Sequence, residues 1–377
     1  MTNMGWMFYE CNSLTSLNLK NFDTSKVTNM QAMFYNCYAL TNIDISGFMT
    51  DNVNSMGWMF YKCNSLTRLD LSNFNTSKVT NMQSMFYNCD ALTNIDISGF
   101  KTDNVTSMGW MFFGCKSLKS VDVSKFNTSK VTIMNNLFTE CEKLTSLDLR
   151  NFNTANVTTM DRMFYGCTAL TQLNVSSFNT ANVTDMHAMF YNCENLTNVD
   201  LSSFQTPKVT DMAFMFRGCS KLKQLDLRGF DTSNVTVMNV MFWSCSSLTT
   251  IYCTKSWNTS KVTNSEIMFQ NCNSLIGGNG TRYNSNYVDK SYARIDGESS
   301  KPGYFTYKAA SKKGDVNGDG SVDVADIGAI IDVMAKGGSN VAADVNGDGV
   351  VDVADIGTVI DIMAANARQL LRFAPPA

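Results

Sequence analysis

Residues 79–102 read VTNMQSMFYNCDALTNIDISGFKT, and close variants of this stretch fill most of the 377-residue chain. The repeat is clearest in the cysteines, which recur every 26 residues. The series is Cys11, Cys37, Cys63, Cys89, Cys115, Cys141, Cys167, Cys193, Cys219 and Cys245, and Cys272 continues it after a one-residue insertion. Self-similarity at a period of roughly 20 to 50 residues is typical of a solenoid, in which each unit packs mainly on its neighbours.

Each repeat contains two apolar patterns with different spacing. One set of apolar side chains is spaced by three or four residues, which predicts one face of a short helix. In one repeat this set is Val27, Met30, Met33, Phe34, Cys37 and Leu40. The segment Leu40-x-x-Ile43-x-Ile45 then changes to a period of two, as in a strand with one buried side. The sequence therefore predicts an α/β solenoid of 26-residue units, each a strand plus a short helix, with the strands in a parallel sheet.

A threonine precedes or opens the predicted helix in each repeat. In the repeat above these are Thr24 and Thr28. Either hydroxyl can accept a hydrogen bond from the first free amides of a helix, so we expect an N-cap at this position.

The spacing Leu66-x-x-Leu69-x-Leu71 resembles the strand signature of leucine-rich repeats. The longer pattern V-T-x-M-x-x-M-F-x-x-C-x-x-L-T-x-L-D-L-S-x-F-x-T, as in Val79–Thr102, resembles more narrowly the BspA-like leucine-rich repeat surface proteins. This resemblance covers residues 1–276 and implies a leucine-rich-repeat-type solenoid. One departure from ordinary leucine-rich repeats is a phenylalanine column in place of a ladder asparagine, so we expect stacked rings at that turn.

We expect the sulfur-containing columns to fill the core rather than to carry chemistry. A thiol recurring at one position of an apolar face fits a buried ladder, because parallel Cβ vectors do not favour disulfides. The methionine columns that begin at Met30 and Met33 fit core packing, and there is no C-x-x-C pair for zinc. The single histidine, His187, is expected at the surface. With no nucleophile–base set and no carboxylate pair in a pocket, we expect no enzyme activity.

One outward strand column is acidic. Stacked carboxylates repel one another, so two interpretations remain. Either local hydrogen bonds hold the carboxylates on a solvated face, or the column is part of an extended polar surface for a host protein or a glycan. The candidate residues of this solenoid face are Asp44, Asp70, Asp96, Asp122, Asp148, Asp200 and Asp226.

The repeat stops after Leu275, where a glycine-rich and then tyrosine-rich segment begins. We expect residues 277–308 to cap the end of the core and residues 309–313 to form a linker. At the other end Met1 stands in the valine column, so the array begins inside a repeat without a signal peptide. We therefore expect further sequence before it.

The sequence after the linker carries a calcium-binding pattern twice. D-x-N-x-D-G begins at Asp315 and again 29 residues later at Asp344. A 12-residue calcium loop supplies oxygens from positions 1, 3, 5, 7, 9 and 12, with glycine at position 6 for the sharp turn. The candidate ligands are Asp315, Asn317, Asp319, Ser321, Asp323 and Asp326, then Asp344, Asn346, Asp348, Val350 (through its carbonyl), Asp352 and Asp355.

Charge and periodicity support this interpretation. Residues 314–366 hold ten Asp, no Glu and one Lys, a net charge of −9 that two Ca²⁺ ions would partly neutralise. Apolar residues follow each loop at helical spacing, which predicts two equivalent helices that pack on each other. They are Ile327, Ile330, Ile331 and Met334, then Ile356, Val359, Ile360 and Met363.

Two calcium loops, each followed by a helix, resemble a type I dockerin over residues 314–366. The resemblance implies a small all-α calcium-loop domain with two Ca²⁺ ions and a cohesin-like partner. Loop positions 10 and 11 contact the cohesin in that family, and since both loops carry the same pair, two binding orientations are implied. These positions are Val324, Ala325, Val353 and Ala354. Residues 367–377 are left as a tail without an assigned role.

Composition narrows the remaining function classes. A net charge of −3 without a basic run argues against a nucleic-acid partner, and no apolar stretch is long enough for a membrane span. We expect a non-catalytic, secreted binding or adhesion protein, extracellular or on the surface of an anaerobic bacterium. The first alternative is an accessory component of an extracellular, cellulosome-like polysaccharide-degrading complex. The second is that the dockerin-like part is only a calcium-stabilised tail.

Overall fold

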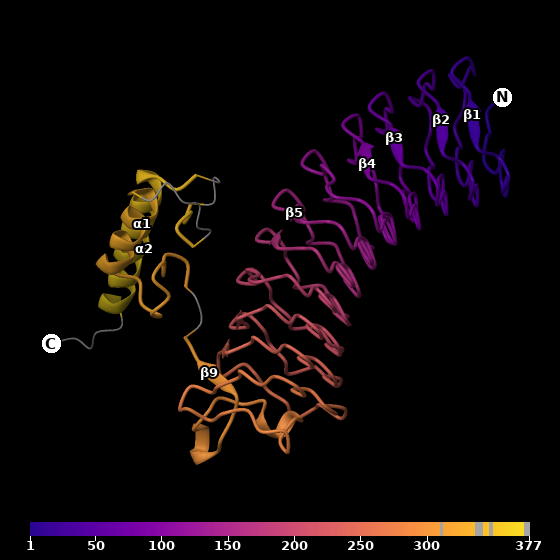
Figure 1. The fold of residues 1–377 in the computed structure, drawn as a ribbon. Coiled ribbons are helices and arrows are strands. Elements are labelled where there is room, and N and C mark those ends of the chain that lie inside the picture. The colour runs from indigo at the N-terminus through magenta and orange to yellow at the C-terminus, as the bar shows by residue number, and fades with distance from the viewer. Residues whose placement is uncertain (310–311, 336–341, 347–349, 373–377) are drawn as a thin grey trace. The chain divides into compact units, whose positions relative to one another are not determined.

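The computed structural model describes residues 1–309, 312–335, 342–346 and 350–372, which fall into two compact units, Met1–Thr306 and Tyr307–Ala377. The first unit is a stack of similar coils, shown from indigo to orange in Figure 1. The second contains helices α1 (Val324–Ala335) and α2 (Val353–Arg372). None of the described helices is both long and apolar enough to cross a bilayer.

Short parallel strands join neighbouring coils. They are β1 (Ser16–Asn18), β2 (Asn42–Asp44), β3 (Arg68–Asp70), β4 (Asn94–Asp96), β5 (Ser146–Asp148), β6 (Gln172–Asn174), β7 (Gln224–Asp226) and β8 (Thr250–Cys253). A further strand, β9 (Phe305–Tyr307), lies beside β8 and comes after the last coil. Ser16 faces Asn42 and Arg68 faces Asn94, so one coil corresponds to one 26-residue repeat. A second line of parallel bridges runs from Asn3 to Asn264. The predicted solenoid with a parallel sheet is confirmed.

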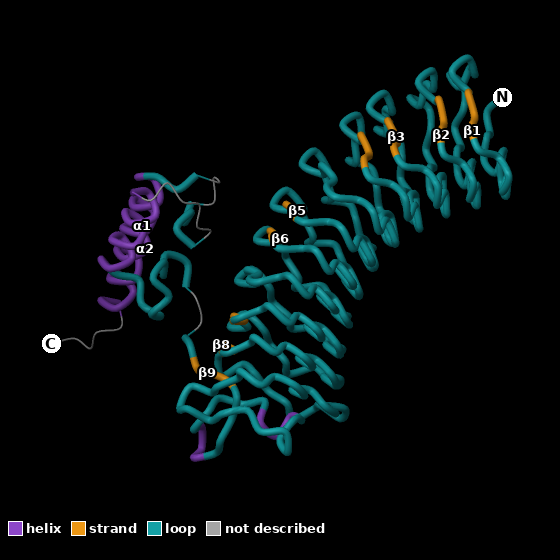
Figure 2. Tube along the Cα trace, in the orientation of Figure 1, coloured by secondary structure: helices purple, strands orange, loops and turns teal. Residues whose placement is uncertain are grey.

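The short helix predicted for each repeat is wrong. Residues 1–276 contain strands and turns but no helix (Figure 2). Where the helix was expected, the amides from Ala32 onward alternate between two kinds of partner. Ala32 N donates to Gly57 O of the next coil at 2.9 Å, whereas Met33 N donates locally to Met30 O at 3.3 Å. An α-helix would keep all of these bonds within its own segment.

Left-handed backbone explains how helical spacing arises without a helix. Ala32 and Asn36 have φ of 52° and 60°, and the equivalent positions of the other coils are also left-handed. The left-handed residue is the third residue of each four-residue turn, and its own amide donates to the neighbouring coil, as Ala32 N does to Gly57 O at 2.9 Å. Consecutive turns of this kind bury side chains that are three or four residues apart in the sequence. A helix buries side chains with the same spacing, so the spacing alone does not distinguish the two structures.

The apolar columns form one continuous core. Phenylalanine rings in the column from Phe8 to Phe269 stack on the next coil with centroids 5.3–6.2 Å apart. The expected second ring column is also present, with Phe48 and Phe74 stacked at 6.3 Å. Met30 and its equivalents are fully buried, which confirms the packing role of the methionines.

The cysteines form a ladder inside this core. All twelve are unpaired, and all but the partly exposed Cys11 are buried. From Cys37 to Cys272, each thiol of the 26-residue series donates to a phenylalanine carbonyl of the preceding coil, as Cys89 Sγ does to Phe60 O at 3.2 Å. Burial raises the pKa of Cys89 to about 12, so its thiolate does not form near neutral pH. The predicted role of these thiols as core filling is confirmed.

A column of buried threonines links each coil to the next, in place of the expected N-cap. Thr154 Oγ1 donates to Asn179 O at 2.8 Å and accepts from Asn179 N at 2.8 Å. Both bonds cross to the following coil, so the backbone of that coil satisfies the hydroxyl of a fully buried threonine as donor and as acceptor. The column consists of Thr24, Thr50, Thr76, Thr102, Thr128, Thr154, Thr180, Thr206 and Thr232.

The segment after the last coil covers the end of the core. Phe305 in β9 meets Phe242 and Phe269 edge to face at 6.4 and 6.0 Å, and Tyr304 is fully buried. Trp257 Nε1 donates to Ala293 O at 3.0 Å. Two short 3-10 helices, Lys290–Tyr292 and Glu298–Ser300, lie in this segment.

In the second unit, α1 and α2 pack through a narrower face than the sequence suggested. Ile330 and Val359 are fully buried, as expected. However, Ile331 and Ile360 are 51% and 50% exposed, so their assignment to the helix–helix contact is wrong. Consecutive residues of a helix point about 100° apart, so Ile331 and Ile360 point away from the direction of Ile330 and Val359. Because each helix packs on only one other helix, these two isoleucines remain outside the contact.

We predict that Thr154→Val lowers the free energy of unfolding by roughly 1–3 kcal/mol, because it removes both hydrogen bonds between the fully buried Thr154 hydroxyl and the Asn179 backbone. Urea denaturation of the full chain measures this change. Thr158→Val, at an exposed threonine of the same coil, is the control and is expected to have little effect. Equal losses in the two variants would contradict the structural role of the threonine column.

Candidate functional site

The acidic column lies at the ends of the strands, and its carboxylates hold local turns. Asp70 Oδ1 accepts hydrogen bonds from Ser72 N at 3.0 Å and Ser72 Oγ at 2.7 Å. Asn18 and Asn174 accept from the residue two positions on in the same way. This is an Asx turn, which requires an oxygen on a short side chain. The seven aspartates of the predicted solenoid face thus occupy equivalent turn positions.

These hydrogen bonds favour the charged carboxylates. Bonds from the serine two positions on lower the pKa of Asp44, Asp70 and Asp122, and a bond from Arg150 lowers the pKa of Asp148. A lowered pKa contributes stability above the ordinary carboxyl pKa, and this is lost as pH falls through the lowered value. The hydrogen bonds thus stabilise the charged form of these four carboxylates, and one oxygen of each is engaged in its turn.

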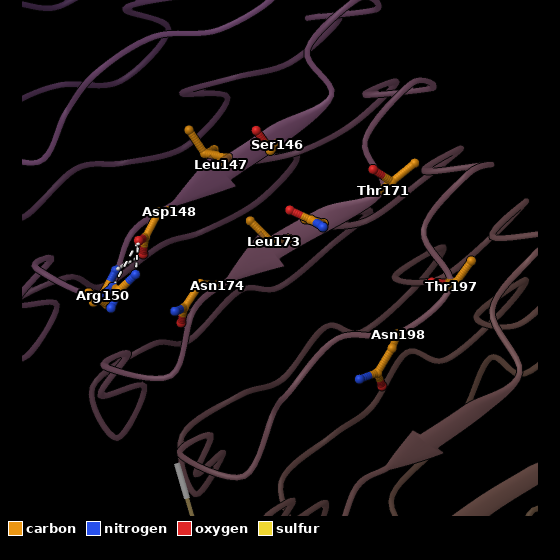
Figure 3. A pocket seen from close by; sticks show the side chains of 10 residues that line it. Ser146, Leu147, Asp148, Arg150, Thr171, Leu173, Asn174, Thr197 and Asn198 are labelled. Carbon is orange, nitrogen blue, oxygen red and sulfur yellow. Dashed lines mark hydrogen bonds and ion pairs between the residues drawn. The ribbon is translucent and has the colours of Figure 1, made fainter. Parts of the chain in front are cut away.

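A hollow of about 540 Å³ lies on this face over β5, β6 and the following coil (Figure 3). Here the acidic column is interrupted, because Asn174 stands where an aspartate would be, and Arg150 neutralises Asp148 at 2.5 Å. The hollow therefore combines amide and hydroxyl groups with little net charge. Its lining residues are Ser146, Leu147, Asp148, Arg150, Thr171, Gln172, Leu173, Asn174, Thr197 and Asn198.

The residues that line this hollow come from separate stretches of the sequence and could not be predicted from it as one site. Gln172, Asn174 and Asn198 lie on different coils or strand positions and become neighbours only through the 26-residue register. The available signal was the neutral Asn174 in an acidic column, next to the basic Arg150 of the preceding coil.

His187 is less exposed than the sequence suggested. Its side chain is 24% exposed, and Nδ1 lies 3.7 Å from Asp211 Oδ1 of the next coil. Its ring also packs at 5.3 Å from that of Phe214. The histidine is thus part of the contact between two coils.

We predict that Asp70→Ala lowers the free energy of unfolding by roughly 0.5–1 kcal/mol through loss of the Asx turn. Asp70→Asn is the matched variant and is expected to be nearly neutral, because asparagine holds the same turn at positions 18 and 174. Urea denaturation near neutral pH separates the two. Equal losses for Ala and Asn would show that the charge matters and the turn does not.

The first predicted calcium loop contains a buried carboxylate oxygen that has no partner. Asp315 is 5% exposed, its Oδ2 accepts from Gly320 N at 3.0 Å, and its Oδ1 is buried without a hydrogen bond. Gly320 has φ of 93°, as the sharp turn requires. A buried anionic oxygen is costly unless a cation or donor approaches it. The interior of this loop therefore fits a cation that prefers oxygen ligands.

The last ligand position of each loop is also buried. Asp326 accepts from Asn317 N at 3.1 Å and Asp323 N at 2.8 Å, so it ties the start of the loop to its end. In the second loop Asp355 makes the equivalent bonds, from Asn346 N at 3.0 Å and from the amide of residue 352 at 2.9 Å. Within the residues that the structure describes, the last aspartate of each loop therefore accepts the same hydrogen bonds.

The remaining ligand candidates are a mixed set of donors. Within the part of the chain that the structure describes, no group of three or more His, Cys, Asp or Glu side chains is gathered as a metal site. The predicted set also relies on Asn317, on Ser321 and on the carbonyl of Val350, as a calcium loop does. Asp344 and Val350 are described, whereas Asp348 lies outside the described residues.

The predicted partner-binding residues lie at the exposed starts of the two helices. Val324 and Val353, the first residues of α1 and α2, are each 71% exposed. Ile331 and Ile360 follow seven positions later, on the same side of each helix, and are also exposed. Each helix thus presents the same pair of apolar side chains to solvent.

The alanines at the predicted contact positions are exposed as well, and their amides fix the helix starts. Ala325 N donates to Asp323 Oδ1 at 2.8 Å, and Ala354 N donates to Asp352 Oδ1 at 2.7 Å. The aspartate at loop position 9 therefore acts as an N-cap, which positions the contact residues directly beside the predicted ion site.

This fold defines a modular protein, with a leucine-rich-repeat-type solenoid followed by a small helical domain with calcium-type loops. The family described as "Mycoplasma protein of unknown function, DUF285" matches residues 2–120, 88–197 and 171–278, more than half of the chain, and the chain belongs to this family. It is a BspA-like leucine-rich repeat protein. The "Dockerin type I domain" matches residues 313–364, and domains of this type bind calcium. Both families are non-catalytic modules.

Solved structures with leucine-rich repeats are similar to this chain. A leucine-rich repeat protein from Bacteroides ovatus ATCC 8483 has 19% identity over 74% of this chain and 82% of its own, with a TM-score of 0.33. A leucine rich cell surface protein from Faecalibacterium prausnitzii A2-165 has 20% identity over 71% of this chain and 73% of its own, with a TM-score of 0.36. No curated protein matches the sequence.

Proposed function

We propose that this chain is a non-catalytic binding protein, extracellular or on a cell surface, whose dockerin binds two Ca²⁺ ions and docks to a cohesin-like partner. The observation that carries the proposal is the buried, unpartnered Asp315 Oδ1 inside a loop whose geometry recurs 29 residues later. A purely structural tail would have no need to bury the unpaired carboxylate oxygen of Asp315.

The proposed ligand set accounts for the charge of the domain. Bound calcium would supply positive charge to a segment with a net charge of −9 and would link each loop to the helix that follows it. Asp323 is the N-cap of α1 and also stands at loop position 9. The same residue would therefore bind the ion and fix the start of the helix. The proposed ligands are the twelve loop positions named from the sequence, with Asp315 and Asp326 at the ends of the first loop.

We assign the partner surface to the exposed starts of the helices. Val324 and Ile331 on α1, and Val353 and Ile360 on α2, are apolar side chains left in solvent on a small acidic domain. Exposed apolar groups beside charged ones are typical of a docking surface. Because the two helices carry equivalent pairs, the partner has two equivalent surfaces to bind.

The solenoid would supply the second binding activity. The hollow over β5 and β6 offers amides and hydroxyls with little net charge, which suits a neutral ligand that both donates and accepts hydrogen bonds. We therefore favour a glycan or a polar protein segment at the strand face, with the acidic column on either side disfavouring polyanions.

A second candidate function is an accessory role in an extracellular polysaccharide-degrading complex. The dockerin favours this role, because such a domain would attach the solenoid to a cohesin-bearing assembly. The two candidates differ in what the dockerin and the solenoid capture from the source organism and its surroundings.

We predict that Ca²⁺ raises the thermal stability of the second unit in the full chain and that removal by EDTA reverses this. Calorimetry of the full chain, with the solenoid transition as internal reference, measures the effect. The double variant Asp315→Ala with Asp344→Ala is expected to lose most of the calcium-dependent shift, because the first ligand of each loop is gone. An unchanged calcium response in this variant would contradict the assigned ligands.

Docking is tested on the same protein by pull-down with and without EDTA. Val324→Asp combined with Val353→Asp is expected to abolish calcium-dependent capture of a cohesin while leaving the calcium-dependent stability in place, because neither side chain is a ligand. Val324→Asp alone and Val353→Asp alone are the controls. Each leaves one helix surface intact, so each single variant should still dock in one of the two orientations. Capture that is insensitive to both EDTA and the double variant would overturn the proposal.

A further inference from the structure

Arg217 occupies a position that is aromatic in the neighbouring coils. Along this column tyrosines stack from coil to coil, as Tyr165 and Tyr191 do with centroids 4.3 Å apart. Arg217 continues the stack with its guanidinium, whose Cζ lies 4.5 Å from the Tyr191 ring and 4.2 Å from the Trp243 ring. A planar cation held between two ring faces is fixed in orientation without using its N–H donors.

Those donors are not used elsewhere. Among the described residues the Arg217 guanidinium makes no hydrogen bond and no ion pair, and its Nε is buried without a partner. By contrast, Arg150 and Arg228 of the same solenoid pair with Asp148 and Asp226 at 2.5 and 2.8 Å. Burial lowers the pKa of Arg217, which reflects the cost of desolvating a cation that lacks an anion. Packing alone would be served by the tyrosine found in the preceding coils.

The guanidinium borders a separate pocket of about 260 Å³. The other lining residues are Asn192, Glu194, Gly218, Ser220 and Ser244. None of them belongs to the polar hollow over β5 and β6. The pocket offers one cation, one carboxylate, an amide and two hydroxyls, and its volume suits a group the size of a single ring.

We propose that this pocket binds a uronic acid residue, an acidic sugar whose carboxylate pairs with the Arg217 guanidinium. The planar fork of arginine matches a carboxylate with two parallel hydrogen bonds. Asn192, Ser220 and Ser244 are suited to the ring hydroxyls, and Glu194 can accept from a hydroxyl. Because Glu194 repels a second negative charge, the sugar unit seated in the pocket carries a single negative charge surrounded by hydroxyl donors, which favours a uronic acid over a phosphorylated sugar. This inference does not depend on the dockerin or on the strand face.

The test is calorimetric titration of the full chain with trigalacturonate, and with its methyl ester as a probe of the same shape without the charge. We expect the acid to bind, with an affinity that falls as salt is added, and the ester to bind at least tenfold more weakly. Arg217→Tyr restores the residue of the preceding coils, so it should fold with unchanged thermal stability and lose binding at least tenfold. Arg217→Lys keeps the charge without the planar fork and is expected to bind more weakly than the native chain.

Several outcomes would overturn the proposal. These are an ester that binds as well as the acid, a folded Arg217→Tyr protein with unchanged affinity, or no binding of trigalacturonate to the native chain at millimolar concentration. An acetylated triglutamate peptide that binds more tightly than trigalacturonate would assign the pocket to acidic peptides and exclude the sugar. If Arg217→Tyr fails to fold, Glu194→Gln provides the second variant, which should bind the acid more tightly because a repulsive charge is removed.

Discussion

The solenoid depends on backbone hydrogen bonds that each coil can complete only with its neighbour. In the turn segments every second amide donates to the next coil, as Phe60 N does to Met85 O at 2.9 Å. A buried amide without a partner is costly, so a single coil cannot close on itself. The same register places equivalent residues of successive coils over one another, so rings, thiols and threonines form columns. The rings and thiols fill the core, and the threonines form hydrogen bonds to the next coil.

This constraint determines where recognition can occur. Buried columns are fixed by their contacts, and even the acidic column is engaged through the Asx turns that end the strands. A position can carry a residue that differs from the rest of its column, provided that the 26-residue register is kept. Asn174 and Arg217 are two such departures, and each borders a hollow or pocket. The second unit follows a different rule, because its loops place carboxylates inward at the start of each helix.

The sequence predicted the repeat, its period, the identity of the core columns and the two calcium-type loops, because these follow from residue type and spacing. It did not predict the turns at Ala32 and Asn36, since left-handed backbone leaves the same apolar spacing as a helix. It also could not separate Ile330 from Ile331, because burial depends on how wide a contact the partner helix makes. The unpaired Arg217 was invisible for a related reason, since the two rings that hold it lie one coil away on each side.

The central claim is that one 26-residue coil is the unit of structure and that its neighbour completes it. Deleting residues 79–104 removes one full period and joins position 78 to an equivalent Val105, whereas deleting residues 79–91 removes half a period and breaks every column beyond it. Thermal unfolding of both proteins, compared with the native chain, tests the claim. We predict that the full-period deletion folds with a cooperative transition and a modestly lower stability, and that the half-period deletion does not. A half-period deletion as stable as the full-period one would contradict the account.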